Sequence, residues 1–169
     1  YGSGGIGSIG HIVGETFKNG EGLKMEHIGY KGSSPMHNDL LAGTIKLAID
    51  TLPQNVPFMK EGKLKAIAVT SSKRAPLSPD VASVLEFKQP KLVAENFLGL
   101  SGPAGLPAAV VTRLHQATQK ALTDGTIVKR MEDLGVHSTA MSSAEFTKFV
   151  ENQVSDWAGP VKASGATLN

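Results

Sequence analysis

The chain opens with Tyr1-Gly2-Ser3-Gly4-Gly5-Ile6-Gly7-Ser8, in which four of eight residues are glycine and two are serine. Residues 9 to about 19 follow with apolar side chains at the spacing of one helix face, and Ser8 occupies the expected N-cap position. Glycine leaves backbone N–H groups uncovered, and a helix N-terminus adds unpaired N–H groups at the positive end of its dipole. The sequence therefore predicts a loop that binds an anion.

The same loop has two other interpretations. Residues 2–7 match the dinucleotide-binding pattern G-x-G-x-x-G, and Glu26 lies about 20 residues further on, where that pattern places an acid. The alternative hypothesis is therefore a nucleotide-dependent enzyme that uses the Gly2-Gly7 loop. However, no strand pattern precedes the loop, and Glu26 falls inside a predicted strand rather than at its end. A structural turn that binds nothing is the third interpretation.

The composition excludes several classes of protein. The 17 basic residues are dispersed among 15 acidic ones, so no basic cluster indicates nucleic-acid binding. Cysteine is absent, which excludes disulfides and thiolate metal sites. No apolar run approaches the ~20 residues of a transmembrane helix. The sequence has neither an initiating Met nor a signal peptide, so we expect a processed chain or a fragment.

The first 70 residues alternate strand patterns with helix patterns. Ser33 or Ser34 is the expected N-cap of the second helix, which Gly43 ends. A third helix opens at a proline and ends at Gly62. The strand patterns cover residues 23–28, 45–49 and 64–70. This alternation predicts a mostly parallel α/β sheet, and Asp50 follows a strand at the edge where such sheets bind ligands.

The last 70 residues are mainly helical. A strand-like segment at 97–100 precedes amphipathic helices from Pro107 and from about residue 126, and a capping box opens the last helix. Gly159-Pro160 is expected to bend or end that helix. One strand cannot form a sheet face for three helices, so we expect their apolar faces, including Phe149 and Trp157, to pack on something else.

The candidate binding residues lie at the predicted strand-to-helix corners. His11 belongs to the first turn after the glycine loop, where it could reach an anion, whereas His27, His115 and His137 are expected to be surface or edge residues. No metal-binding spacing and no G-x-S-x-G elbow occur, so we expect no metal, no cofactor and no catalytic residue. The candidate ligand-binding residues are Ser3, Gly4, Gly5, Ile6, Gly7, Ser8, His11, Lys31, Gly32, Ser33 and Asp50.

Four ordered motifs together resemble one family. They are Tyr1 to Ser8 with His11; Tyr30-Lys31-Gly32-Ser33-Ser34-Pro35 followed by Asp39-Leu40-Leu41-Ala42-Gly43; residues 64–71 with Arg74; and Gly99-Leu100 leading to Pro103-Ala104-Gly105-Leu106-Pro107. Their order and spacing resemble those of the Bug receptors, also called the TctC family. Members of this family are extracytoplasmic solute-binding receptors of tripartite tricarboxylate transporters.

The resemblance implies an α/β fold of the periplasmic-binding-protein-like type II, with two lobes. Residues 1–93 would form most of lobe two and carry the ligand loops, and residues 94–169 would supply a crossover strand and helices that complete lobe one. Family members are nearly twice as long as this chain, so the N-terminal part of lobe one would be missing. Either that missing part or a second copy of the chain would then cover Phe149 and Trp157 from outside residues 1–93.

The resemblance also implies a function. The chain would be a non-enzymatic periplasmic receptor that passes a small organic carboxylate to the membrane components of the transporter. The ligand would be a di- or tricarboxylate, an acidic amino acid or an aromatic carboxylate. The ligand loops of lobe two carry over onto Ser3 to Ser8 with His11, and onto Lys31 to Ser34.

Overall fold

The computed structural model describes residues 1–167, which form two compact units. The first unit contains Tyr1–Asn96 and the segment from Asp156 onward, and the second contains Phe97–Ser155. The first unit therefore extends slightly beyond the predicted boundary after residue 93. It also includes the segment from Asp156 onward, which was predicted to belong to the other part. The assignment of the two units to lobes of a larger receptor stays a prediction.

The first unit is built around three parallel segments. Strand β1 (Gly2–Ser3) pairs in parallel with β2 (Ile28–Gly29). On its other side Gly2 forms a parallel bridge with Ala48, in which the Gly2 amide donates to Leu47 O (2.9 Å) and the Ile49 amide donates to Gly2 O (3.0 Å). The glycine-rich start of the chain is thus the central segment, and the predicted parallel direction is confirmed.

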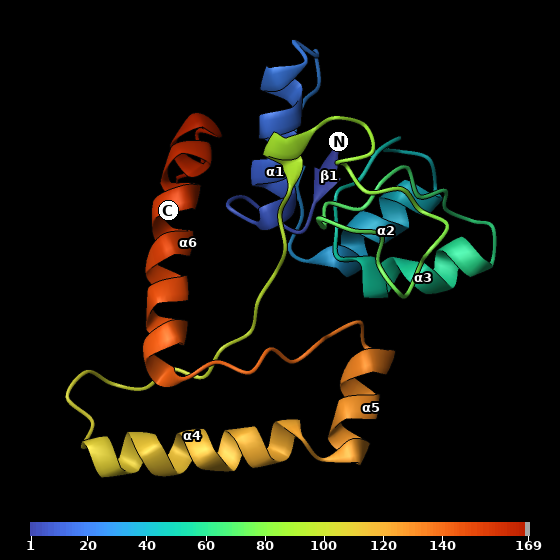
Figure 1. Ribbon diagram of the computed structural model, residues 1–169. Coiled ribbons are helices and arrows are strands. Elements are labelled where there is room, and N and C mark those ends of the chain that lie inside the picture. The colour runs from blue at the N-terminus through green and yellow to red at the C-terminus, as the bar shows by residue number, and fades with distance from the viewer. Residues whose placement is uncertain (168–169) are drawn as a thin grey trace. The chain divides into compact units, whose positions relative to one another are not determined.

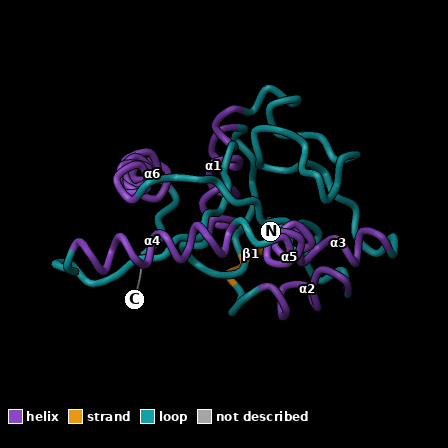
Figure 2. The backbone as a smooth tube through the Cα atoms, turned by 60° about the horizontal axis from the view of Figure 1, so that its bottom comes forward, coloured by secondary structure: helices purple, strands orange, loops and turns teal. Residues whose placement is uncertain are grey.

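A helix follows each of the three parallel segments. These helices are α1 (Ile9–Gly20), α2 (Ser33–Leu41) and α3 (Leu52–Lys60) (Figure 1). Because the segments run in the same direction, their carboxyl ends and the beginnings of the helices share one edge of the sheet. Figure 2 shows how little of the chain is strand and how much of the first unit is loop.

Helix α1 lies directly on the central segment. A Cβ atom on Gly10 would overlap the carbonyl oxygen of Ile49, and a Cβ atom on Gly14 would overlap the ring of Tyr1. Glycine at both positions lets the helix backbone approach the strands closely. The N-terminus of α1 is therefore held at a fixed place beside the loop that precedes it.

The core of the first unit is small. Val13, Val84, Leu92 and Ala94 form its buried cluster, and Trp157 packs against it. Trp157 belongs to α6 (Ser143–Ala163). The expectation that Trp157 is covered by material outside residues 1–93 is therefore wrong.

Gly159-Pro160 was expected to bend or end the last helix, and the second of these two outcomes is wrong. Helix α6 continues to Ala163, and the Ser164 amide donates to Pro160 O at 3.0 Å. A proline removes only its own backbone donor, so the turns on either side of it can remain hydrogen-bonded.

The second unit is helical. It contains α4 (Ala108–Leu122), α5 (Gly125–Asp133) and the first part of α6. Phe149 packs edge-on against Phe97 with ring centroids 5.0 Å apart, and Phe146 stacks on Phe149. Phe149 thus has its partners within its own unit. No helix among residues 1–167 has the length and apolar character needed to cross a bilayer.

The strand predictions were too long. Residues 23–27 and 97–100 contain no strand, and the segments at 45–49 and 64–70 are reduced to isolated bridges at Ala48 and Val69. Ile67 is 68% exposed and Leu98 is 86% exposed, so no neighbouring strand packs on either side chain. Alternation of apolar and polar residues indicates a local preference for strand. A strand also needs a neighbouring strand with which to pair.

The cap predictions were mostly right. Ser8 Oγ accepts from the His11 amide (3.2 Å), and Ser142 and Glu145 form the expected capping box. The N-cap of α2 is Gly32 rather than Ser33 or Ser34, because the chain enters the helix with φ of 100° at residue 32, a conformation that favours glycine. Gly43 follows the end of α2 with φ of 76°, as expected.

A glycine-to-alanine pair tests the close packing of α1. We expect Gly10→Ala to lower the free energy of unfolding by about 1–3 kcal/mol, because the added methyl group would overlap Ile49 O. Gly20→Ala lies on the same helix with open space around it, so it should be neutral or stabilise by up to about 1 kcal/mol. Urea unfolding monitored by circular dichroism measures both. Equal stabilities for the two variants would contradict the packing described here.

Candidate functional site

The ends of the three parallel segments bring the predicted loops together. The Gly32 amide donates to Gly4 O (3.0 Å), so the loop after β2 lies against the loop after β1. Ser33 Oγ donates to Asp50 Oδ1 (2.8 Å), which joins the second loop to the end of the third segment. The structure therefore places the glycine loop, Ser33 and Asp50 side by side. Lys31 lies on the same loop as Ser33, with an exposed side chain.

The glycine loop satisfies some of its own amides and leaves others open. Three amides donate to protein acceptors: Gly5 to Ser3 Oγ (3.3 Å), Gly7 to His11 Nδ1 (3.1 Å) and Ser8 to Gly5 O (3.2 Å). The amides of Gly4 and Ile6 have no acceptor within the described part of the chain. Two backbone donors therefore remain for a bound anion, fewer than a fully open loop would offer.

Ser3 supports the loop from beneath. It is fully buried, and its hydroxyl accepts from the Gly5 amide and from Ser8 Oγ (3.2 Å). Two further partners complete its surroundings: Gly5 O at 3.1 Å, to which the hydroxyl can donate, and His27 Nε2 at 2.7 Å. A buried hydroxyl with this set of partners cannot reach a ligand as a nucleophile. Ser3 thus shapes the loop.

Two histidine rings stack beneath the loop. His11 and His27 have ring centroids 4.0 Å apart and planes inclined by 19°. His11 Nδ1 accepts from the Gly7 amide, so this nitrogen carries no proton. Burial lowers the pKa of His11. Burial and the neighbouring His11 lower the pKa of His27 to about 4. Both rings are therefore neutral near pH 7.

Of the two expectations for His27, a surface or an edge histidine, the structure supports the second, because His27 directly precedes β2 at the edge of the sheet. His27 is partly buried and contacts Ser3 and the ring of Tyr1. Its position follows from the parallel pairing, because β2 begins at Ile28 beside β1. Only the correct register of the two strands could have revealed this contact from the sequence.

A chain of polar contacts extends from the stacked histidines along α1. The Tyr1 hydroxyl donates to Glu15 Oε1 (2.9 Å), and Lys18 forms an ion pair with the same carboxylate. Burial acts to raise the pKa of Glu15, but the hydrogen bonds from Lys18 and Tyr1 lower it overall. The carboxylate is thus already neutralised by protein groups.

A second polar network lies under the start of α2. His37 Nε2 lies 3.1 Å from Asp50 Oδ2 and 3.1 Å from Asn55 Oδ1. Asn55 Nδ2 donates to Asp50 Oδ2 (3.2 Å) and to Thr51 O (2.9 Å). The side chain of Asp50 is only 8% exposed, so its predicted role as a ligand contact is better described as holding Ser33.

The sequence reasoning missed His37 and Asn55. His37 is four residues after Ser33 on α2, so the two side chains share one helix face, and this spacing is a usable signal. Asn55 lies in the first turn of α3, and only the tertiary structure brings it to Asp50.

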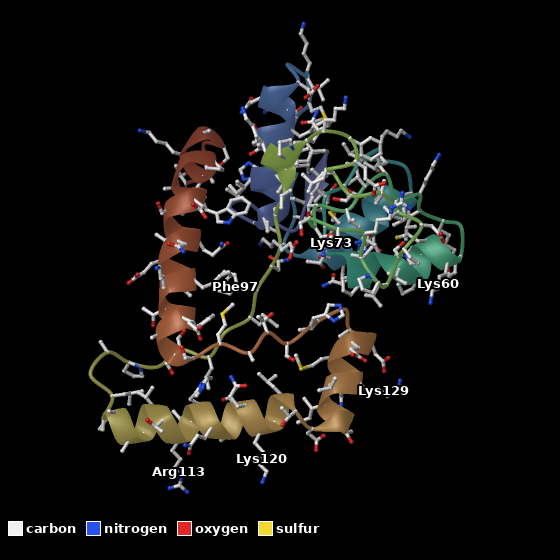
Figure 3. The ribbon with its side chains drawn as sticks, viewed as in Figure 1. Lys60, Lys73, Phe97, Arg113, Lys120 and Lys129 are labelled. Atoms are coloured by element: carbon white, nitrogen blue, oxygen red, sulfur yellow. The ribbon has the colours of Figure 1, made fainter. Side chains whose placement is uncertain are left out.

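The described residues of the site form no metal-binding cluster and place no buried cationic side chain there. Residues 1–167 contain no group of three or more His, Asp or Glu side chains that could bind a metal ion. Lysines near the site are exposed, and Figure 3 shows Lys60 at the end of α3 pointing outward. Recognition of an anion here would therefore depend on backbone amides and hydroxyl groups.

The chain is similar to known proteins in sequence and in structure. Residues 1–165 match the family described as the tripartite tricarboxylate transporter family receptor, TctC. Protein BugT of Bordetella pertussis is 28% identical over 163 residues, which cover 96% of this chain and 50% of BugT.

Two solved structures are similar over nearly the whole chain. The structure of R. palustris Rpa4515 with adipate has a TM-score of 0.85 and 29% identity, covering 98% of this chain and 55% of that one. A structure described as a periplasmic transporter has a TM-score of 0.86 and 33% identity. The match covers 100% of this chain and 56% of that one. The chain thus spans about half the length of BugT and of both solved proteins. These similarities confirm the predicted periplasmic-binding-protein-like α/β fold.

The stacked histidines predict a loss of stability in acid. Their pKa values are lower in the folded protein than in the unfolded chain, where a histidine titrates near 6.5, so the unfolded state binds more protons. The stabilisation that the neutral histidines contribute is fully present above pH 6.5. This contribution is lost as the pH falls toward 4. We expect the free energy of unfolding to drop by roughly 1–2 kcal/mol over this range through His27, since solvent screens part of the effect.

Urea unfolding at pH 7 and pH 4.5 measures this loss. His27→Gln should reduce the difference between the two pH values, whereas His137→Gln, on an exposed residue, should leave it as in the parent protein. A His27→Gln variant with an unchanged difference would show that the ring does not titrate as described.

Proposed function

Because the chain belongs to the tripartite tricarboxylate transporter receptor family, we propose that it forms part of a periplasmic receptor for a small organic carboxylate and supplies two of its ligand-binding loops. The observation that carries this proposal is the pair of open amides at Gly4 and Ile6, on a loop that packs against Ser33. Receptors of this kind bind and release their ligand unchanged, so the chain is not an enzyme.

A carboxylate suits these donors chemically. Backbone amides at the start of a helix bind anions through directed hydrogen bonds and through the helix dipole, and such bonds are stronger than those between neutral groups. Water can bridge the remaining carboxylate oxygen to Ser8 or to the exposed Lys31. The similarity to Rpa4515, which was solved with adipate, supports a ligand with a carboxylate group.

The two units fit the two-lobe organisation of such receptors. We assign the first unit, with both loops, to most of lobe two, and the second unit to the part of the chain that completes lobe one. The remaining ligand contacts would then come from the half of the receptor that lies outside this chain. The ligand would be passed on to the membrane components of the tripartite transporter.

The nucleotide-dependent enzyme is the less favoured alternative. Glu26 lies before β2 rather than at its carboxyl end, where an acid that binds ribose is found. Ser3, the buried hydroxyl of the loop, is enclosed by protein partners. Neither feature suits cofactor binding or nucleophilic chemistry at this loop.

Thermal-shift measurements on the full-length protein test the proposal. We expect stabilisation by one or more of succinate, glutarate, adipate, citrate and glutamate, and none by NAD or ATP. The transition temperature should rise with ligand concentration, because a ligand that binds only the folded state stabilises it by mass action.

A Gly4→Ala variant tests whether the ligand binds at the glycine loop. Gly4 has no positive φ angle, and an added Cβ would lie no closer than 3.9 Å to its neighbours, so the variant should fold normally. The methyl group would occupy the space between the two loops and weaken ligand affinity by about tenfold or more. Gly125→Ala in α5, which also has open space, is the matched control. Stabilisation by a nucleotide alone would favour the enzyme instead.

A further inference from the structure

The Ser33 hydroxyl donates its hydrogen bond in one fixed direction. It donates to Asp50 Oδ1 at 2.8 Å, and an ionised carboxylate can only accept hydrogen bonds. A serine hydroxyl has a single proton, so the lone pairs of Ser33 Oγ are all that it can offer to other groups. Toward a ligand, Ser33 is therefore a hydrogen-bond acceptor and not a donor.

Buried neighbours hold this arrangement in place. Asp50 and His37 have side chains that are 8% and 9% exposed, and His37 Nε2 lies 3.1 Å from Asp50 Oδ2. Asn55 Nδ2 donates to the same oxygen at 3.2 Å and is itself tied to Thr51 O. Because its second oxygen is engaged by two groups, the Asp50 carboxylate cannot turn away from Ser33.

The fixed acceptor lies beside the open amide of the glycine loop. A Cβ on Gly4 would lie 3.9 Å from Ser33 Oγ, and the Gly32 amide donates to Gly4 O. Ser33 Oγ is therefore within reach of a group on a ligand that is bound beside Gly4. Because the Ser33 proton is donated to Asp50, Ser33 Oγ presents only lone pairs to that ligand, which favours a hydrogen-bond donor there.

We propose that Ser33, held by Asp50, His37 and Asn55, selects carboxylates that carry a hydroxyl or ammonium group on the carbon next to the carboxylate. This inference rests on the proposed function of the same loops. The ligand group donates to Ser33 Oγ while the carboxylate accepts from the Gly4 amide. The same acid without a donor offers no hydrogen bond to the lone pairs of Ser33 Oγ.

The expected preference is moderate. A hydrogen bond to a partly exposed neutral acceptor corresponds to about tenfold in affinity, less than the discrimination of a fully buried site. Ser33 is partly exposed in this structure, so we expect the donor-bearing acid to bind about tenfold more tightly than its plain counterpart.

Calorimetric titration of the full-length protein with matched acids tests the inference. The series at three chain lengths are succinate, malate and aspartate; glutarate, 2-hydroxyglutarate and glutamate; and adipate, 2-hydroxyadipate and 2-aminoadipate. Within the length that binds best, we expect the hydroxy acid or the amino acid to exceed the plain acid by about tenfold. Which of the two binds more tightly identifies the donor.

Two variants assign the preference to Ser33. Ser33→Ala should bind the plain acid within about twofold of the parent protein and lose the preference. Ser34→Ala removes a neighbouring exposed hydroxyl on α2 and should retain the preference. If Ser33→Ala fails to fold by circular dichroism, Ser33→Gly replaces it as the test, because glycine also removes the hydroxyl.

Each outcome is decisive. A plain acid that binds as tightly as both donor-bearing acids would overturn this inference and leave the proposed function standing. If Ser33→Ala still preferred the donor-bearing acids, the inference would also be overturned, since a group other than Ser33 would then accept the hydrogen bond from the ligand. Binding of none of the nine acids would overturn this inference, and the proposed function would fall as well only if citrate and aromatic carboxylates also failed to bind.

Discussion

The parallel pairing of β1 between β2 and residues 47–49 is the constraint on which the rest of the first unit depends. Because the three segments run in one direction, each of the following helices begins at the same edge, and the polar loops between strand and helix meet there. Gly10 and Gly14 let α1 lie directly on the central segment, so the loop before it has little freedom to move. The site thus follows from strand direction and from the absence of two Cβ atoms.

Each loop at this edge rests on its own polar network. Ser3, His11 and His27 support the glycine loop, and they use the Gly7 amide internally while Gly4 and Ile6 stay open. Asp50, with His37 and Asn55, supports the second loop and fixes the proton of Ser33. Buried polar groups of this kind are costly when unsatisfied, so their hydrogen bonds restrain the loops. This restraint keeps the donors and acceptors in place before a ligand arrives, which lowers the entropic cost of binding.

Local sequence signals predicted the local structure well. The glycine loop, the Ser8 cap, the capping box at Ser142 and the parallel direction all follow from short-range patterns, and the four ordered motifs led to the correct family. The contacts of His27 and Asn55 could not be predicted in this way, because they depend on which segments pair and on how helices pack. Trp157 shows the same limit, since its partners lie more than 60 residues away in the chain. Strand lengths failed because alternation alone does not supply a neighbouring strand.

The proposed site requires that the two open amides of the glycine loop bind the carboxylate. Backbone amide NMR of the isotope-labelled full-length protein, titrated with a carboxylate that stabilises it, observes these amides individually. We expect large, saturable shifts of the Gly4 and Ile6 amide protons, and a small shift for the Gly7 amide, which already donates to His11. Saturable binding that shifts other residues and leaves the Gly4 and Ile6 amides unchanged would contradict the proposed site.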